Sequence, residues 1–252
     1  MAIYKTEAIV LERRDYRETS YLLRLFTSDF GKLNAQAKGA KRKVDKFGTN
    51  FLPISYNKIV FYDNKRSDLH ILSQADQLEH FDSISSSIEK FTYASYFLEL
   101  VSAAMPLGQK NKEVFELVMC FLNVLNKKEE VKDIVQIFEI KFLSLSGFNP
   151  RLDCCVSCNT HLLEKSRFSY VLGGLLCPSC FSVDPAARPV MQGTIASVNH
   201  IEKMDLEKMA SFCMVASVRK ELEQILRNFI DFHLGQKFKT LEFMKKVRFT
   251  YV

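Results

Sequence analysis

The sequence contains no tryptophan, and it lacks the short motifs that mark several common classes of enzyme. It has no P-loop for nucleotides, no Gly-x-Ser-x-Gly turn for a catalytic serine and no His-Glu-x-x-His pair for a catalytic metal. Its five histidines are scattered along the chain. These absences favour a binding protein over an enzyme.

Long apolar runs are also absent. The longest candidate, residues 93–107, is interrupted by Glu99 and is too short to span a membrane. The first seven residues do not have the shape of a secretory signal, so we expect a cytoplasmic protein with no membrane partner. In a reducing cytoplasm, the seven cysteines are expected to be thiols or metal ligands rather than disulfides. With 252 residues, 47% of them hydrophobic, the chain can form one or two ordinary globular domains.

Four of the cysteines form two pairs, Cys155-x2-Cys158 and Cys177-x2-Cys180, with eighteen residues between the pairs. Two residues between cysteines allow one tight turn to direct both sulfurs at a single ion. The stretch from 167 to 176 reads as strand, turn and strand, with two glycines to form the turn. We therefore predict one structural Zn²⁺ held by four thiolates, with no open position for water.

Other readings of the cysteines remain. An iron–sulfur cluster also uses four thiolates, whereas a thioredoxin-like redox centre would have a single pair at the start of a helix. Cys154 could replace Cys155 in a C-x3-C arrangement, and His161 is close enough in sequence to be a ligand. Cys120 and Cys213 lie in apolar helical patterns and are expected to be small buried hydrophobic residues.

The net charge is +6, and the positive charge is concentrated at the two ends of the chain. Residues 1–80 carry fourteen Lys and Arg against ten Asp and Glu. A basic loop contributes Lys38, Lys41, Arg42, Lys43 and Lys46, and a second basic cluster contributes Arg13, Arg14 and Arg17. These residues are candidates for contacts with a nucleic-acid backbone, and the alternative is a solvated surface.

The first eighty residues read as five short strands, at residues 4–13, 20–27, 32–38, 54–63 and 69–74. Five antiparallel strands in so short a stretch predict a small closed barrel, with the five-stranded OB fold favoured over an SH3-like barrel. Several aromatic residues in this region belong either to the barrel core or to a surface on which bases stack: Tyr16, Phe26, Phe30, Phe47, Tyr56, Phe61 and Tyr62.

From residue 84 the apolar period becomes helical. Helices are predicted at residues 85–105, 112–126, 131–146 and 214–234, the last two closed by Gly147 and Gly235, and residues 184–189 read as a linker. The predicted organisation is an OB-fold nucleic-acid-binding barrel over residues 1–80. It is followed by an all-α helical domain over residues 81–252, with a zinc-binding segment inserted at 151–183.

In this order the elements resemble the RecO family of bacterial recombination mediators. Residues 8–13 and 16–27 look like the family's first two barrel strands, and Phe30–Lys32 with Lys38–Arg42 look like its next turn and basic loop. The run 146–150 before the first cysteine pair, and the glycines before the second, look like its zinc segment. The resemblance covers nearly the whole chain.

The resemblance implies a DNA repair protein without catalytic turnover. Such proteins bind single- and double-stranded DNA, anneal complementary strands and act on DNA coated by the single-strand binding protein. With the partner RecR they help to load RecA; RecF is a further candidate partner, and the expected location is the cytoplasm, in association with the nucleoid. Two alternatives are a zinc-braced adaptor that binds proteins without binding DNA, and an enzyme such as a thiol oxidoreductase or a nuclease.

Overall fold

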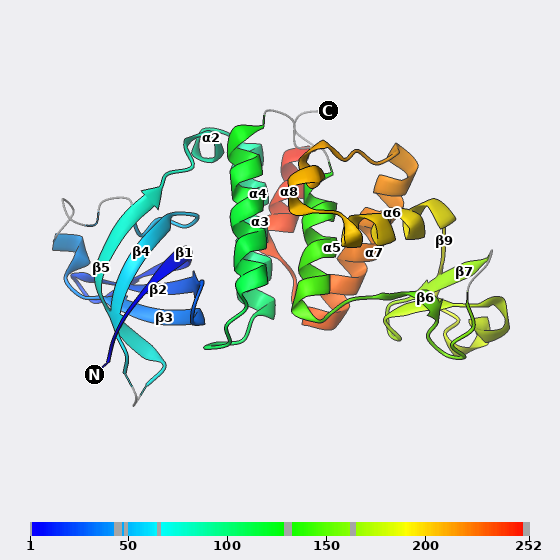
Figure 1. Ribbon diagram of the computed structural model, residues 1–252, viewed down its shortest axis with the longest axis horizontal. Coiled ribbons are helices and arrows are strands. Elements are labelled where there is room, and N and C mark those ends of the chain that lie inside the picture. The colour runs from blue at the N-terminus through cyan, green and yellow to red at the C-terminus, as the bar shows by residue number, and fades with distance from the viewer. Residues whose placement is uncertain are drawn as a thin grey trace. The chain divides into compact units, whose positions relative to one another are not determined.

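A computed structural model describes residues 2–42, 47, 50–64, 67–128, 133–161 and 165–248 of the chain. The chain forms two compact units (Figure 1). Unit 1 comprises Met1–Lys128 and Phe238–Val252, and unit 2 comprises Glu129–Lys237. The predicted domain boundary at residue 80 stays a prediction.

Unit 1 begins with a closed five-stranded barrel. Its strands are β1 (Ile3–Tyr16), β2 (Ser20–Thr27), β3 (Gly31–Ala37), β4 (Tyr56–Tyr62) and β5 (Leu69–Glu79), in the order β1-β2-β3-β5-β4. The barrel closes because β1 pairs with both β2 and β4. The five predicted strands and the OB-fold barrel are confirmed. The expectation that all neighbours are antiparallel is wrong for one pair: β3 and β5 run parallel, because β4 lies beside β1 rather than beside β3.

The barrel interior follows from the alternation of side chains along each strand. In β3 the residues at 31, 33, 35 and 37 are buried, while those between them are half-buried. Phe47 and Phe51, which lie between β3 and β4 in the sequence, belong to the barrel core, and their rings stack at 5.0 Å. Asn57, which is buried in β4, donates to the carbonyl oxygen of Asn50 at 2.8 Å.

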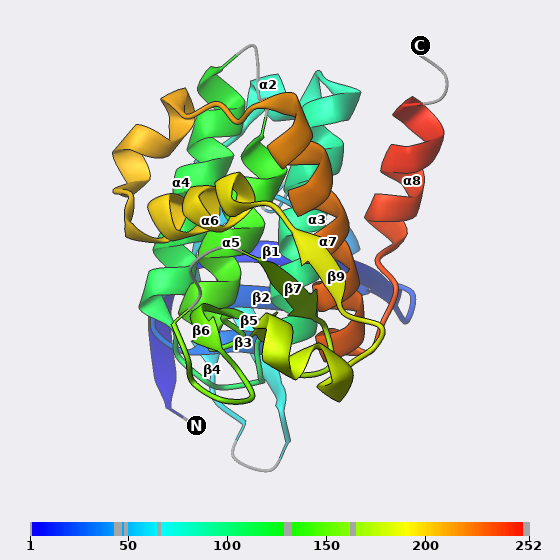
Figure 2. The ribbon, with the colours of Figure 1, turned by 90° about the vertical axis from the view of Figure 1, so that its right-hand side faces the viewer.

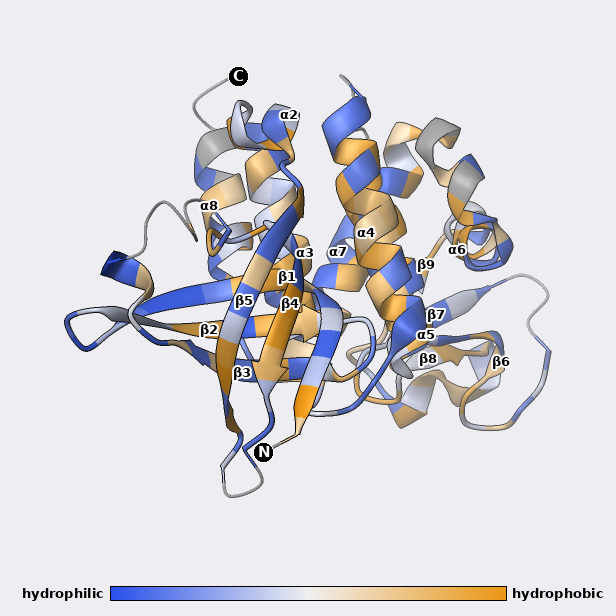
Figure 3. Cartoon of the chain, turned by 60° about the vertical axis from the view of Figure 1, so that its left-hand side comes forward, coloured by the Kyte–Doolittle hydropathy of each residue, from blue (hydrophilic) through white to orange (hydrophobic). Residues whose placement is uncertain are grey.

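Four helices complete the described part of unit 1: α2 (Asp82–Ser85), α3 (Ile88–Ala104), α4 (Lys112–Lys127) and α8 (Lys239–Arg248). Apolar and polar residues alternate along α4 with the helical period (Figure 3). The barrel is joined to the helices by hydrogen bonds: Lys32 donates through Nζ to the carbonyl oxygen of Ser102 (2.6 Å) and accepts at its own carbonyl from the amide of Gly108 (2.9 Å). At Gly31, where φ is +64°, a Cβ atom would lie 2.0 Å from the carbonyl oxygen of Gln109. Only glycine permits this close approach.

Unit 2 combines three helices with a small sheet (Figure 2). The helices are α5 (Ile134–Ser146), α6 (Gln192–Lys203) and α7 (Ala216–Leu234), and they pack on one another. The sheet contains β6 (Arg151–Cys155), β7 (Ser166–Ser169), β8 (Gly174–Leu176) and β9 (Arg188–Val190), in the order β6-β8-β7-β9. Two 3-10 segments, Pro178–Val183 and Leu206–Ser211, complete the described elements of this unit. In the part of the chain that the structure describes, no helix is long and apolar enough to cross a membrane.

The predicted helices are confirmed, with small shifts at their starts. The α5 and α7 helices end at left-handed glycines, Gly147 and Gly235, as predicted. The predicted first helix, residues 85–105, corresponds to α3, which begins later because Ser87 caps its start by accepting from the amide of Lys90; the short α2 precedes it. The linker prediction for residues 184–189 is partly wrong, since β9 begins at Arg188 and pairs with β7. Helices α6 and α8 were not predicted.

In the two unpredicted helices, the residue before the first turn does not cap the helix with its own side chain. At the start of α6, a carboxylate from α7 takes this role: Glu221 accepts from the amide of Met191 (3.0 Å) and from the hydroxyl of Thr194. At the start of α8, Glu99 from α3 accepts from the amides of Lys239 (3.0 Å) and Thr240 (3.1 Å). A carboxylate placed against free amides also favours the positive end of the helix dipole.

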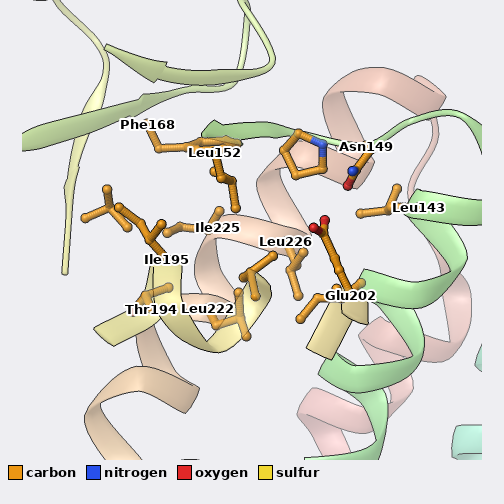
Figure 4. A pocket seen from close by; sticks show the side chains of 14 residues that line it. Leu143, Asn149, Leu152, Phe168, Thr194, Ile195, Glu202, Leu222, Ile225 and Leu226 are labelled. Atoms are coloured by element: carbon orange, nitrogen blue, oxygen red, sulfur yellow. The ribbon is translucent and has the colours of Figure 1, made fainter. Parts of the chain in front are cut away.

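A small apolar cavity of about 20 Å³ lies among α5, α6, α7 and the sheet of unit 2 (Figure 4). A volume of this size holds about one water molecule. Glu202 and Asn149 bring polar groups to an otherwise mostly aliphatic wall. The Oε1 atom of Glu202 is buried and has no hydrogen-bond partner among the described residues. Burial raises the pKa of Glu202, and the opposing effects of Asn149, Lys141 and Lys203 do not cancel it.

We expect Glu99→Ala to destabilise α8 by about 1 kcal/mol, because the first amides of that helix lose their protein acceptor. Amide hydrogen exchange should become faster across Lys239–Arg248. Glu116→Ala is the matched control, since the ion pair of Glu116 with Lys112 is exposed and lies within α4. Unchanged exchange in α8 would show that Glu99 does not fix this helix.

We expect Glu202→Gln to stabilise unit 2 at neutral pH by less than about 1 kcal/mol, because Glu202 is only partly buried. A carboxyl group whose pKa is raised on folding stabilises the folded state most at pH values below its ordinary pKa of 4.5. That stability is lost as the pH rises through the folded pKa. Unfolding measured between pH 4.5 and 7 should therefore show a flatter pH dependence in the variant. Glu223→Gln, which breaks the pair with Arg227 at 3.3 Å, should bring no gain. An unchanged pH profile in Glu202→Gln would contradict the prediction.

Candidate metal centre and nucleic-acid surface

The four paired cysteines come together in unit 2. The sulfur atoms of Cys155, Cys158, Cys177 and Cys180 all lie within 4.8 Å of one another, and those of Cys158 and Cys177 are 3.6 Å apart. Four sulfurs around a tetrahedral zinc ion are separated by about 3.8 Å, since each Zn–S bond is about 2.3 Å long. The sulfurs are too far apart for disulfides, which need about 2.05 Å. The donor set and the spacing therefore fit a single metal ion.

Local backbone geometry places the two pairs. Cys155 ends β6, and the following turn is closed by Asn159, whose amide donates to the carbonyl oxygen of Cys155 and whose φ is +61°. Cys177 follows β8, and the amide of Cys180 returns to its carbonyl oxygen at 2.9 Å. The predicted strand, turn and strand are present as β7 and β8. Strands β6 and β8 approach closely because residue 174 is glycine: a Cβ atom there would lie 2.4 Å from the carbonyl oxygen of Arg151.

Hydrogen bonds at two of the four sulfurs, Cys155 and Cys158, favour the ionised form that a metal requires, whereas burial and the neighbouring thiols raise the pKa of Cys177 and Cys180. Burial acts to raise the pKa of Cys155, but backbone amides, led by that of Cys177 at 3.4 Å, lower it to about 6. The hydroxyl of Thr160 lies 3.3 Å from the sulfur of Cys158 and lowers the pKa of that thiol. Such contacts are typical of the environment that surrounds a thiolate–metal site.

Cys154 and His161, the two alternative metal ligands, lie outside the four-sulfur group. Cys154 precedes Cys155 on the same strand, so its side chain points to the opposite face, and it is buried outside the four-sulfur group. His161 pairs with Cys154 through a backbone bridge and is exposed, and it also lies outside the group. The expectation that Cys120 and Cys213 are buried is wrong: Cys120 is half-buried in α4, and Cys213 is exposed in a segment that precedes α7.

The barrel brings three of the predicted basic residues together at one end. The amide of Lys41, in the 3-10 turn η1 (Ala40–Arg42), donates to the carbonyl oxygen of Thr19 in the β1–β2 turn at 3.0 Å. Two cations lie over the ring of Tyr21: Arg13 Cζ is 4.8 Å and Lys41 Nζ is 5.4 Å from the ring centroid. Arg17 occupies the β1–β2 turn with φ of +52° and lies over the ring of Tyr16. We call Arg13, Arg17, Lys41 and Tyr21 the basic barrel end.

The remaining basic candidates do not all join this surface. Lys38 and Arg42 are exposed on either side of Lys41. Arg14 alternates with Arg13 along β1, so it faces the other way and pairs with Glu12 at 2.5 Å. Lys43 and Lys46 lie outside the described residues.

The aromatic residues divide between core and surface. Phe47 and Phe61 are buried in the barrel core, whereas Phe26 is buried outside that cluster, with its ring 5.9 Å from the ring of Phe115 in α4. Tyr16, Phe30, Tyr56 and Tyr62 are half-buried, and the hydroxyl of Tyr56 donates to Glu7 at 2.5 Å. Tyr21, which lies under two cations, was not predicted as a site residue, because no local motif marks it. The only signal was that it would lie beside Arg13 if the first two strands formed a hairpin.

The barrel, the helices and the four-cysteine group together define a modular protein built on an OB fold. Comparison with known families is specific: the family described as "Recombination protein O N terminal" matches residues 1–81, and "Recombination protein O C terminal" matches residues 85–242. The chain belongs to this recombination protein O (RecO) family, as its sequence resemblance indicated.

Curated relatives align with nearly the whole chain. The DNA repair protein RecO of Alkaliphilus metalliredigens is 33% identical over 97% of this chain and 100% of its own length. The proteins of the same name from Desulforudis audaxviator and Syntrophus aciditrophicus are 30% and 29% identical; each match covers 98% of this chain, and 98% and 97% of the respective relative. Family membership supports a role in DNA repair and recombination.

We expect Cys177→Ser to remove the metal, because three thiolates and a hydroxyl bind zinc less tightly than four thiolates. Metal analysis by mass spectrometry should find about one zinc ion per chain in the parent and much less in the variant. Protease cleavage should become faster within Glu129–Lys237 and change little in the barrel, which belongs to the other unit. Cys213→Ser, at an exposed cysteine outside the group, is the control and should keep its metal. A parent protein without zinc, purified without chelator, would refute the site.

Proposed function

We propose that this chain is a DNA-binding recombination mediator. It holds single- and double-stranded DNA, anneals complementary strands and, with RecR, helps to load RecA onto DNA coated by the single-strand binding protein. Membership of the RecO family supports this role at the level of repair and recombination. The observation that carries the DNA-binding part is the convergence of Arg13, Arg17 and Lys41 at one end of an OB barrel.

The chemistry of this surface suits a phosphate backbone. Guanidinium and ammonium groups that replace condensed counterions give binding that weakens steeply with salt and depends little on sequence. OB folds bind single strands with a positively charged groove and aromatic side chains. Lys38 and Arg42 extend the surface, and Lys43, Lys46 and Arg14 remain further candidate contacts.

We further propose that the four cysteines hold one structural Zn²⁺. Its role would be to fix the short strands of unit 2, because a site closed by four thiolates leaves no position for water or substrate. The helices and the ribbon around the zinc would then offer surfaces for protein partners, among which RecR, the single-strand binding protein and RecF are the candidates. The cytoplasmic, nucleoid-associated location also stays a prediction.

The test is annealing of complementary oligonucleotides by the purified full-length protein, together with DNA binding measured over a range of salt concentrations. Salt-sensitive binding and faster annealing are expected. Absence of DNA binding at low salt would instead favour the protein adaptor, which keeps the zinc site but has no use for the basic surface.

We expect the double variant Lys41→Gln/Arg42→Gln to bind oligonucleotides about tenfold more weakly at low salt, with a salt slope reduced by about 1 to 2. The reason is that two cations no longer release counterions. Lys112→Gln/Lys127→Gln removes the same charge from the two ends of α4 and is the matched control. Equal losses in the two double variants would show that net charge, rather than the basic barrel end, governs binding.

A further inference from the structure

One carboxylate, that of Asp15, contacts a cation of the basic barrel end. Asp15 is on β1 between Arg13 and Arg17, directly opposite Tyr21 on β2. Residues directly opposite on paired strands share a face, so Asp15 and Tyr21 point to the same side of the barrel. The Oδ2 atom of Asp15 is 3.1 Å from the Nζ atom of Lys41, which also lies over the ring of Tyr21.

The two partners of this ion pair differ in exposure. The Lys41 side chain is only 25% exposed and its Nζ atom lies over the ring of Tyr21, whereas the Asp15 side chain is 78% exposed. The carboxylate is therefore the more accessible partner of the pair. An exposed pair of this kind contributes about 1 kcal/mol or less, so a competing anion can replace the carboxylate at little cost.

We propose that Asp15 is a built-in competitor of the DNA backbone. In the free protein its carboxylate occupies Lys41, and a bound phosphate displaces it. This exchange lowers affinity and lets a strand leave again, as a protein that pairs two strands and then releases them requires. The inference rests on the proposed DNA binding and concerns the regulation of that same surface.

The neighbouring residue Glu18 provides a matched control. It is exposed in the same β1–β2 turn and carries the same charge, but it makes no ion pair with any described residue. Loss of its charge tests the general electrostatic effect of one fewer acid at this end of the barrel. Any further effect of removing Asp15 then belongs to its contact with Lys41.

The experiment measures the affinity of the full-length protein for a single-stranded oligonucleotide across a salt series. Asp15→Asn should bind about three- to tenfold more tightly than the parent at low salt, and its salt slope should be steeper by about 0.7, the value for one more cation on a single strand. Glu18→Gln should bind less than about twofold more tightly. In a Lys41→Gln background, Asp15→Asn should lose most of its gain, because the cation that it frees is gone.

Four outcomes would overturn the inference. Equal gains for Asp15→Asn and Glu18→Gln would leave only a general charge effect, and an undiminished gain in the Lys41→Gln background would place the competition elsewhere. A parent that binds DNA while Asp15→Asn binds no more tightly would refute the inference and leave the proposed function standing. A parent that does not bind DNA at all would refute both.

Discussion

The helical parts of both units depend on how the free amides at helix starts are satisfied. The first four amide groups of a helix have no partner within it, so each helix start needs acceptors from outside. Helices α3 and α4 take them from the preceding Ser87 and Asn111. Helices α8 and α6 instead borrow carboxylates from elsewhere in the same unit: Glu99 of α3 holds the start of α8, and Glu221 of α7 holds the start of α6. Each such contact fixes the position of a helix as well as its end.

This difference explains which helices the sequence could predict. A cap that lies next to its helix is a local signal, and the helices with Ser87, Asn111, Gly147 or Gly235 at their ends were all predicted. The starts of α6 and α8 carry no such signal, because Glu221 and Glu99 are remote in sequence. The strands were predictable from their alternation, but the parallel pairing of β3 with β5 was not. It depends on where β4 lies in the closed barrel, and no short pattern encodes that position.

The candidate sites also differ in how far local sequence could predict them. The cysteine group could be predicted because two residues between ligands determine the local turn, and only the choice between Cys154 and Cys155 needed the strand to be seen. The basic barrel end could be predicted only in part. Arg13 and Arg14 are adjacent in sequence and face opposite ways, whereas Arg13 and Lys41 are distant and lie over one ring. Tyr21 and Asp15 acquire their roles only from the pairing of β1 with β2.

Exposure separates two uses of carboxylates in this chain. Asp133 has no exposed side-chain surface, and it accepts from the amide of Met214 at 2.8 Å and pairs with Arg219, so loss of any partner would leave a buried charge unsatisfied. Such a group cannot exchange its partners and is structural. Among the described residues, Asp15 forms its ion pair with Lys41 at the surface, where water can take over from either partner. The same chemical group therefore acts as a permanent brace where it is enclosed, and as a replaceable partner where its cation is accessible to another anion.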